Sequence, residues 1–162
     1  MKKMKIKFLT LLFVCLPMLT WAKGGVPVLY AQTSGLEDVQ RFTISASWLG
    51  NTSLDCEINV ESLMKNTDDI YFLTTSTQKK KLFPLWDKIK KDFSYKKMMS
   101  IHDDGSNIEC WCNMKSRNTI EEVVMVIQGD NSLLLLGLTG EYSKQQIKEL
   151  MKKNKKITVK TK

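Results

Sequence analysis

Residues 95 to 140 constrain the fold most strongly, because four strand-like segments follow one another with a short polar turn between each pair. The segments are Tyr95–His102, Asn107–Met114, Ile120–Gln128 and Leu133–Gly140. In the second segment the side chains alternate as on a strand, and Gly105 can adopt the positive φ that a tight hairpin requires. Such short connections favour antiparallel neighbours, so the sequence predicts an antiparallel meander.

Two amphipathic segments predict helices that cover this sheet. Residues 82–93 carry apolar side chains at helical spacing, and Pro84 lies near the expected first turn. Ser143 followed by Gln146 forms a capping box, which predicts a C-terminal helix that begins at Lys144.

The N-terminal half gives weaker signals. Ile70–Thr75 predicts a fifth strand, and Val60–Lys65 predicts a short helix before it. Residues 36–50 fit either a helix or a strand. The predicted fold class is therefore α+β, with an antiparallel meander of about five strands and two or three helices packed on one face. The apolar runs Val123–Ile127 and Leu133–Leu136 do not alternate, which indicates that both faces of the sheet are covered there.

The first 22 residues have the layout of a bacterial export signal, a basic lead-in followed by an apolar run from Phe8 to Ala22. The run is shorter than a membrane-spanning helix and contains Pro17, so we expect no retained transmembrane anchor. Cleavage is expected after Ala22, with Ala31 as a weaker alternative.

Four regions of the chain follow from this reading. They are a signal peptide (1–22), a flexible N-terminal lead (23–35), a single α+β domain (36–152) and a basic C-terminal tail (153–162). Cys15 could also be a lipid-attachment site, but Val14 and Phe13 are bulkier than such a site tolerates. A soluble periplasmic or outer-envelope location is therefore expected.

Charge is segregated along the chain. The full chain has 25 Lys and Arg against 17 Asp and Glu, and the net charge of +8 falls to +4 once residues 1–22 are removed. Eight lysines lie between Lys144 and Lys162, opposed there only by Glu149. A terminal lysine run is most often a solvated end, and it can also contact anionic surfaces. The rest of the chain has no basic groove with interleaved aromatics, so we expect no nucleic-acid partner.

Three cysteines remain after the predicted cleavage, which leaves at least one thiol without an intramolecular disulfide. Cys110 and Cys112 share a strand face at about 7 Å, too far apart for easy pairing with each other. Either thiol could pack as a small apolar group or pair with Cys56. A zinc site built from these three cysteines and His102 is the other alternative, although structural zinc sites usually use tight knuckles.

Carboxylate pairs and the single histidine are the remaining chemical candidates. Glu121-Glu122 and Asp68-Asp69 each stand at the start of a predicted strand, where two acids from neighbouring strands could serve glycoside hydrolysis. Adjacent residues on a strand point to opposite faces, so one acid of each pair is expected in solvent. A hydrolase would have to use His102, since the chain has no other histidine.

Several of these segments resemble a known family. They are Asp68–Leu73, Tyr95–Ile101 followed by Asp103-Asp104-Gly105, Ile120–Val126 and Leu138–Gly140. Over roughly residues 36–152 the chain resembles domain of unknown function 4252, a family of small exported proteins from Bacteroides-like bacteria. Some members carry a lipid-attachment cysteine, from which this chain departs at Val14. The resemblance implies an α+β fold and an envelope location, and it supplies no catalytic residue.

The expected function is therefore that of an exported, non-catalytic envelope protein that acts through contacts with a protein or an anionic envelope surface. Its contact element would be the basic C-terminal segment, with Lys144, Lys148, Lys152, Lys153, Lys155 and Lys156. The alternatives are a small-ligand or metal-binding module on the Cys110/Cys112 strand face, and a hydrolase that uses His102. No cofactor is expected, and the oligomeric state is left open.

Overall fold

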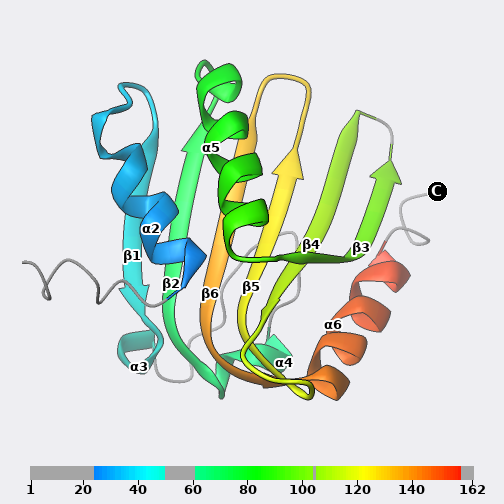
Figure 1. The fold of residues 1–162 in the computed structure, drawn as a ribbon. Coiled ribbons are helices and arrows are strands. Elements are labelled where there is room, and N and C mark those ends of the chain that lie inside the picture. The colour runs from blue at the N-terminus through cyan, green and yellow to red at the C-terminus, as the bar shows by residue number, and fades with distance from the viewer. Residues whose placement is uncertain (1–23, 50–60, 104, 158–162) are drawn as a thin grey trace, which may run out of the picture.

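The computed structural model describes residues 24–49, 61–103 and 105–157 (Figure 1). The helices are α2 (Gly25–Gln32), the 3-10 helix η2 (Thr33–Gly35), α3 (Ala46–Leu49), α4 (Glu61–Met64), α5 (Lys79–Asp92) and α6 (Lys144–Ile157). The strands are β1 (Gln40–Ser45), β2 (Thr67–Thr75), β3 (Lys96–Asp103), β4 (Ser106–Met114), β5 (Thr119–Gln128) and β6 (Leu133–Ser143). The predicted signal, its cleavage site, Cys15 and Cys56 lie outside the described residues.

All six strands form one antiparallel sheet in the order β1-β2-β6-β5-β4-β3. Strands β3 to β6 are the predicted meander, joined by short turns, and Gly105 has the expected positive φ of 79°. The α+β fold class is thus confirmed, with one strand more than predicted. The additional strand is β1, which resolves the ambiguous region around residues 36–50 as strand followed by the short helix α3.

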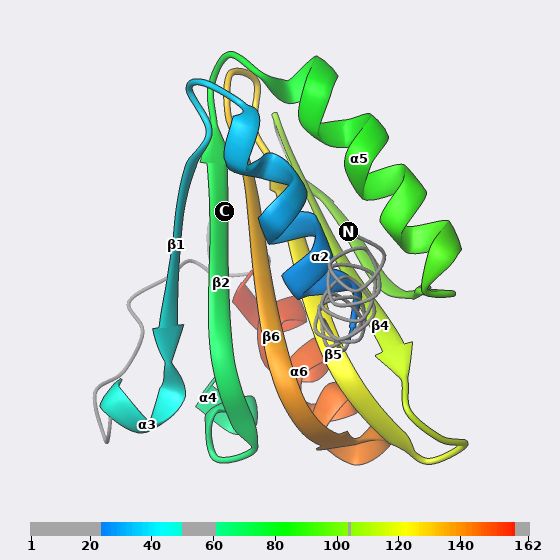
Figure 2. The same ribbon diagram turned by 60° about the vertical axis from the view of Figure 1, so that its left-hand side comes forward.

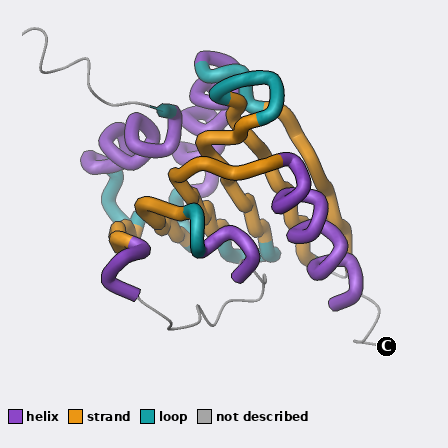
Figure 3. The backbone as a smooth tube through the Cα atoms, turned by 90° about the horizontal axis from the view of Figure 1, so that it is seen from below, coloured by secondary structure: helices purple, strands orange, loops and turns teal. Residues whose placement is uncertain are grey.

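Helices cover both faces of the sheet, whereas the sequence predicted them on one (Figures 2 and 3). Helices α2 and α5 pack with one face, and α4 and α6 pack with the other. On β5, Val123 and Met125 belong to the cluster under α6, while Val124 and Val126 belong to the cluster under α2 and α5. The non-alternating apolar run is therefore explained by two buried faces, as the sequence indicated.

Residues 25–35 are helical and packed, which corrects the prediction of a flexible lead. Val26 and Leu29 of α2 are 4% and 2% exposed, and both belong to the cluster under α2 and α5. The glycines that suggested flexibility instead allow the chain to approach the sheet closely, as described below. Glycine content alone could not distinguish these two uses.

Helix α5 begins three residues earlier than predicted, so Pro84 lies inside it. The Thr75 hydroxyl accepts a hydrogen bond from the Gln78 amide (2.9 Å), just before the first turn. Trp86 and Ile89 are each 1% exposed, whereas Lys80, Lys81, Lys88 and Lys91 are exposed. The apolar face predicted from the sequence is therefore the face that packs on the sheet.

Helix α6 begins with the predicted capping box. The Ser143 hydroxyl accepts a hydrogen bond from the Gln146 amide (3.2 Å), and the Gln146 side-chain oxygen accepts one from the Ser143 amide (2.8 Å). The helix continues to Ile157, beyond the predicted domain end at residue 152. Within the described ranges, no helix is both long and apolar enough to cross a membrane.

Candidate functional site

A buried carboxylate, Glu122 of β5, meets the N-terminal end of α2. The residue is 2% exposed. Its oxygens accept hydrogen bonds from the backbone amides of Gly25 (2.9 Å) and Val26 (3.0 Å). The Tyr95 hydroxyl (2.5 Å) and the side-chain amide of Asn113 (3.1 Å) donate two more. Amides at a helix start carry partial positive charge, so they suit a carboxylate. We call these five residues the Glu122 cluster.

A β-bulge in β5 directs the Glu122 side chain toward α2. In the pairing with β4, the two β5 steps from Ile120 to Glu122 stand opposite the single β4 step from Met114 to Asn113, so Glu121 is the extra residue. Ile120 packs in the cluster under α6, whereas Glu122 lies on the opposite face with α2. On an unbroken strand these two side chains would share a face, so the bulge creates the polar position.

Two consecutive glycines allow α2 to reach the carboxylate. Gly24 has φ of 100°, and a Cβ there would overlap the Glu122 Oε1 atom. A Cβ on Gly25 would lie 2.8 Å from the Tyr95 ring and 2.9 Å from Ile89. Larger residues at either position would therefore displace α2 from the sheet.

The chemistry of the Glu122 cluster fits an anchor. Burial, followed by the adjacent Glu122 charge, raises the pKa of Tyr95 above 10.0, so its hydroxyl stays a donor. Four donors reach this carboxylate, with Oε2 accepting three of the hydrogen bonds and Oε1 accepting the one from Val26. Glu122 is covered by α2 and therefore holds that helix on the sheet.

The second acidic pair, Asp68 and Asp69, lies on β2, which is separated from the strand of Glu122 by β6. Asp68 is exposed and Asp69 is half-buried, while Glu121 is half-buried and accepts a hydrogen bond from Asn113 (3.4 Å). The sequence predicted one solvated acid in each pair, which is correct for the aspartates and wrong for the glutamates. Asp69 and Glu122 flank β6 on either side, about 10 Å apart at the backbone. Because α2 covers Glu122, these acids do not share an open cleft.

Cys110 and Cys112 point into the apolar cluster under α6. Both are free thiols and 0% exposed. The hydrogen bond with Cys110, followed by burial, raises the pKa of the Cys112 thiol and keeps it protonated. Metal ligation and nucleophilic attack both require a thiolate. In this structure the two thiols pack as small apolar groups.

His102 lies on β3 and is exposed. Its neighbour Ile101 packs against the cluster under α6, so His102 points to the other face, away from Cys110 and Cys112. The described residues contain no group of three or more His, Cys, Asp or Glu side chains that could hold a metal ion. The structure therefore does not bring His102 together with the two described cysteines.

Trp111 of β4 is the centre of a second polar contact on the α5 side. Lys90 and Lys97 lie over its ring, at 4.4 and 5.1 Å from the centroid. Glu109 accepts hydrogen bonds from the Trp111 indole (2.9 Å) and from Lys97 (2.8 Å). Burial opposes ionisation of Glu109, yet these two hydrogen bonds lower its pKa. The arrangement ties the end of α5 to strands β3 and β4.

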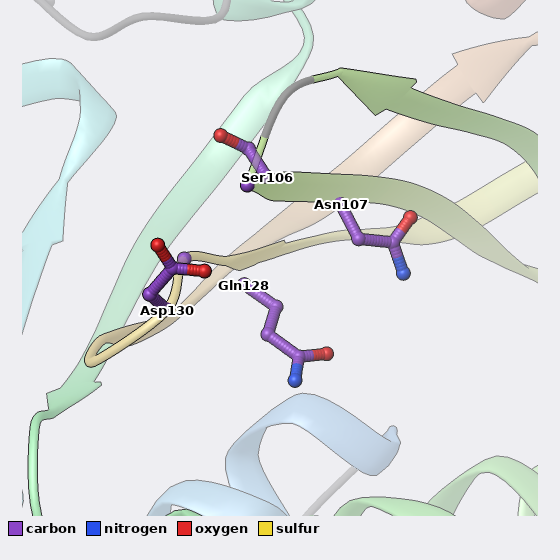
Figure 4. Close-up of a pocket in the computed structure, with 6 residues that line it drawn as sticks. Ser106, Asn107, Gln128 and Asp130 are labelled. Carbon is purple, nitrogen blue, oxygen red and sulfur yellow. The ribbon is translucent and has the colours of Figure 1, made fainter.

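A polar depression of about 430 Å³ lies between the β3–β4 and β5–β6 turns (Figure 4). It is lined by Gly105, Ser106, Asn107, Gln128, Gly129 and Asp130. Lys79 donates hydrogen bonds to the carbonyls of Gly129 (2.7 Å) and Asp130 (2.8 Å) beside it. The ammonium group of Lys79 is therefore bound to backbone carbonyls, and the depression offers the amides of Asn107 and Gln128, the Ser106 hydroxyl and the Asp130 carboxylate.

The predicted contact lysines lie mostly on the outer side of α6. Ile147 and Leu150 are 0% exposed and face the sheet. The exposed lysines of the helix are Lys144, Lys148, Lys152 and Lys153. Lys155 and Lys156 belong to the same helix, whose last residues continue the basic sequence. Glu149 is the acidic residue of this helix.

Sequence reasoning missed the Glu122 cluster. Its members come from four segments, and Gly25 and Glu122 are 97 positions apart. The one signal in the sequence was an acidic residue placed directly before the apolar run Val123–Ile127, in a strand with both faces buried. Such a position predicts a buried acid, which needs donors from another element.

Comparisons with known proteins support one assignment. The family described as "Domain of unknown function (DUF4252)" matches residues 30–150. No curated protein matches the chain. Among solved structures, PA94, a protein of unknown function from Pseudomonas aeruginosa, is similar with 9% identity and a TM-score of 0.30. That match covers 76% of this chain and 82% of the other, and at this TM-score it carries no argument. Since the family match spans most of the sequence, the chain belongs to the DUF4252 family.

Proposed function

We propose that the protein is an exported, non-catalytic component of the cell envelope that acts by contact, with the basic side of α6 as its contact surface. The observation that carries the proposal is the segregation of charge on α6. Lys144, Lys148 and Lys152 recur at intervals of four, which places them on one exposed stripe beside the apolar face. A stripe of this kind suits an anionic lipid or glycan surface.

Export is supported by how the described fold begins. The predicted cleavage after Ala22 leaves α2 complete, because the helix starts at Gly25. Cleavage after Ala31 would remove Val26 and Leu29 from the core and both backbone donors from Glu122. The export reading with Ala22 is therefore compatible with the fold, and the weaker alternative is not.

A non-catalytic role is supported by the state of the candidate reactive groups. Glu122 is buried under α2 and accepts four hydrogen bonds, and both thiols are buried, with that of Cys112 kept protonated by its raised pKa. His102 stands apart from these groups on the sheet. General acid–base or nucleophilic catalysis needs such groups within hydrogen-bond reach of one another at an accessible surface.

The proposal is tested with the mature chain, residues 23–162, and lipid vesicles. Binding is measured by co-sedimentation with vesicles of neutral lipid alone and with vesicles that contain equal parts of neutral and anionic lipid. We expect binding to the anionic vesicles only, and we expect it to weaken as salt is added, because salt screens exposed charges. Each lysine near such a surface contributes about 1 kcal/mol.

Two triple variants decide whether α6 is the contact surface. Lys144, Lys148 and Lys152 are changed together to Glu in one, and Lys80, Lys88 and Lys91 on the exposed side of α5 in the other. Both variants change the net charge equally. The α6 variant should lose binding and the α5 variant should keep it at least in part. Equal loss in both variants, or binding that salt leaves unchanged, would contradict the proposal.

A further inference from the structure

Within the described residues the sheet ends in two edge strands, β1 and β3, and only β3 has features that hinder further pairing. Strand β3 carries the exposed residues Lys96 and His102, and its pairing with β4 has a register shift between Lys97 and Met99. Charged side chains and bulges on an edge hinder the addition of another strand. A second chain is therefore disfavoured at β3.

Strand β1 lacks these protections. It pairs with β2 without a register shift from Gln40 to Ser45. Its one charged residue, Arg41, is turned toward its own chain, where it donates a hydrogen bond to the Tyr30 carbonyl (2.8 Å) and lies 4.9 Å from the Tyr30 ring centroid. Strand β1 forms one edge of the sheet (Figure 1). Its outer side therefore offers backbone groups, while the Arg41 charge is directed to its own chain.

Exposed aromatic surface adjoins the same edge. Phe42 is 47% exposed and stacks on Phe72 of β2 with ring centroids 4.4 Å apart. Trp48, in α3 directly after the strand, is 81% exposed. Clusters of exposed apolar side chains mark interaction surfaces, and an unprotected edge strand is a template for pairing.

We propose that β1 is a self-association surface, through which two copies of the chain pair antiparallel and join their sheets. The charges favour a second copy as the occupant. A two-fold axis centred on Phe42 or Thr43 places Arg41 opposite Thr43 or Ser45 of the other copy, so like charges do not face each other. A strongly charged partner strand would find no complementary charge at this edge.

The unequal edges also limit the assembly to two copies. Pairing of β1 with β3 would repeat without closing, but it would bring the partner strand against Lys96 and the register shift of β3. Pairing of β1 with β1 consumes the unprotected edge of both copies. The expected product is a closed two-fold dimer with β3 at each end.

The dimer should be weak and reversible. Five paired residues in either register supply about five backbone hydrogen bonds, which corresponds to a small interface at the usual density of about one bond per 100–200 Å². Interfaces of this size dissociate on dilution. The association is therefore measured over a wide range of protein concentration.

The test is sedimentation equilibrium of the mature chain, residues 23–162, with Thr43→Lys as the disrupting variant. In either register the new lysine faces Arg41 or another lysine of the second copy, so we expect the dissociation constant to rise about tenfold. Met98→Lys on β3 is the matched control, because it adds the same charge at an exposed edge position and should leave the dimer intact.

Hydrogen exchange of the β1 amides provides a second measurement that needs no variant. Their protection should rise with protein concentration if a second copy covers the edge. A monomer at every concentration would overturn the proposal, and so would equal weakening by both substitutions. β1 amides that are protected equally at all concentrations would show that another part of the same chain covers the edge.

Discussion

The two faces of the sheet bury different chemistry, although the same strands supply both. On the α2/α5 face, Glu122 accepts hydrogen bonds from Tyr95, from Asn113 and from the start of α2. The α4/α6 face is apolar around the cysteines, and its buried polar contact joins the hydroxyls of Thr67 and Tyr142 (2.9 Å). One face holds a charged acceptor and the other holds neutral groups.

This difference shows two ways to attach a helix to a sheet. Helix α6 is held by apolar area from Ile147 and Leu150 and begins with its own capping box. Helix α2 has no side-chain cap of its own, since its N-cap is Gly24, and Glu122 supplies the acceptor from the sheet. Attachment of α2 therefore depends on one distant side chain, whereas attachment of α6 is shared among several contacts.

The largest effect is expected at Glu122. Glu122→Ala removes the acceptor from four donors and leaves a cavity, so the free energy of unfolding should fall by about 4 kcal/mol. Urea denaturation measures this loss. Glu122→Gln keeps the size and one acceptor, and it should cost about half as much. A loss below about 1 kcal/mol for Glu122→Ala would contradict the anchor role.

On the opposite face, Ile147→Ala should cost about 3 kcal/mol, because it removes buried side-chain volume under α6. The comparison is sharpened by hydrogen exchange. Ile147→Ala should speed exchange in α6 and leave the Gly25 and Val26 amides protected. Glu122→Ala should speed exchange of the Gly25 and Val26 amides and leave α6 protected. The same exchange pattern in both variants would mean that the two faces are not independent.

Much of the fold could be predicted from local sequence patterns. The period of two in Asn107–Met114 and the Ser143/Gln146 capping box depend on neighbouring residues, and both were confirmed. The helical state of residues 25–35 was missed. Gly24 and Gly25 suggested a flexible segment, because the sequence alone does not show their close contacts with Glu122 and Tyr95.

The candidate site was harder to predict than the fold. Glu122 and Tyr95 meet only because a bulge at Glu121 changes the face of the strand, and a bulge leaves no period in a single sequence. The placement of helices on both faces was missed for a related reason. Periodicity shows which side of a helix is apolar, but it does not say which face of the sheet that side will cover.

Two buried tyrosines provide a smaller and more closely matched comparison. Tyr95→Phe removes a hydrogen bond to a carboxylate, so the free energy of unfolding should fall by about 2 kcal/mol. Tyr142→Phe removes a hydrogen bond to the Thr67 hydroxyl and should cost about 1 kcal/mol. Thermal or urea denaturation at neutral pH measures both. Equal losses would mean that the Glu122 charge adds nothing to the tyrosine contact.

The same tyrosines predict how stability depends on alkaline pH. Burial, then the Glu122 charge, raises the folded-state pKa of Tyr95, while the unfolded chain titrates near the model-compound value of 10.0. Above pH 10 the unfolded state therefore binds fewer protons, and stability falls as pH rises, by up to about 1.4 kcal/mol per pH unit for each such group. Tyr95→Phe should make the decline less steep between pH 10 and 11. An unchanged slope would contradict this assignment.

The smallest effect is expected at the start of α6. Ser143→Ala removes the acceptor for the Gln146 amide, and the free energy of unfolding should fall by about 1 kcal/mol. The Gln146 side chain also donates to the Asn66 side-chain oxygen (2.8 Å), so it stays placed without Ser143. Gln146→Ala and the double variant complete a mutant cycle, measured by urea denaturation. A coupling energy near zero would mean that each half of the capping box acts alone. The attachment of α6 would then depend on its apolar face, just as the attachment of α2 depends on Glu122.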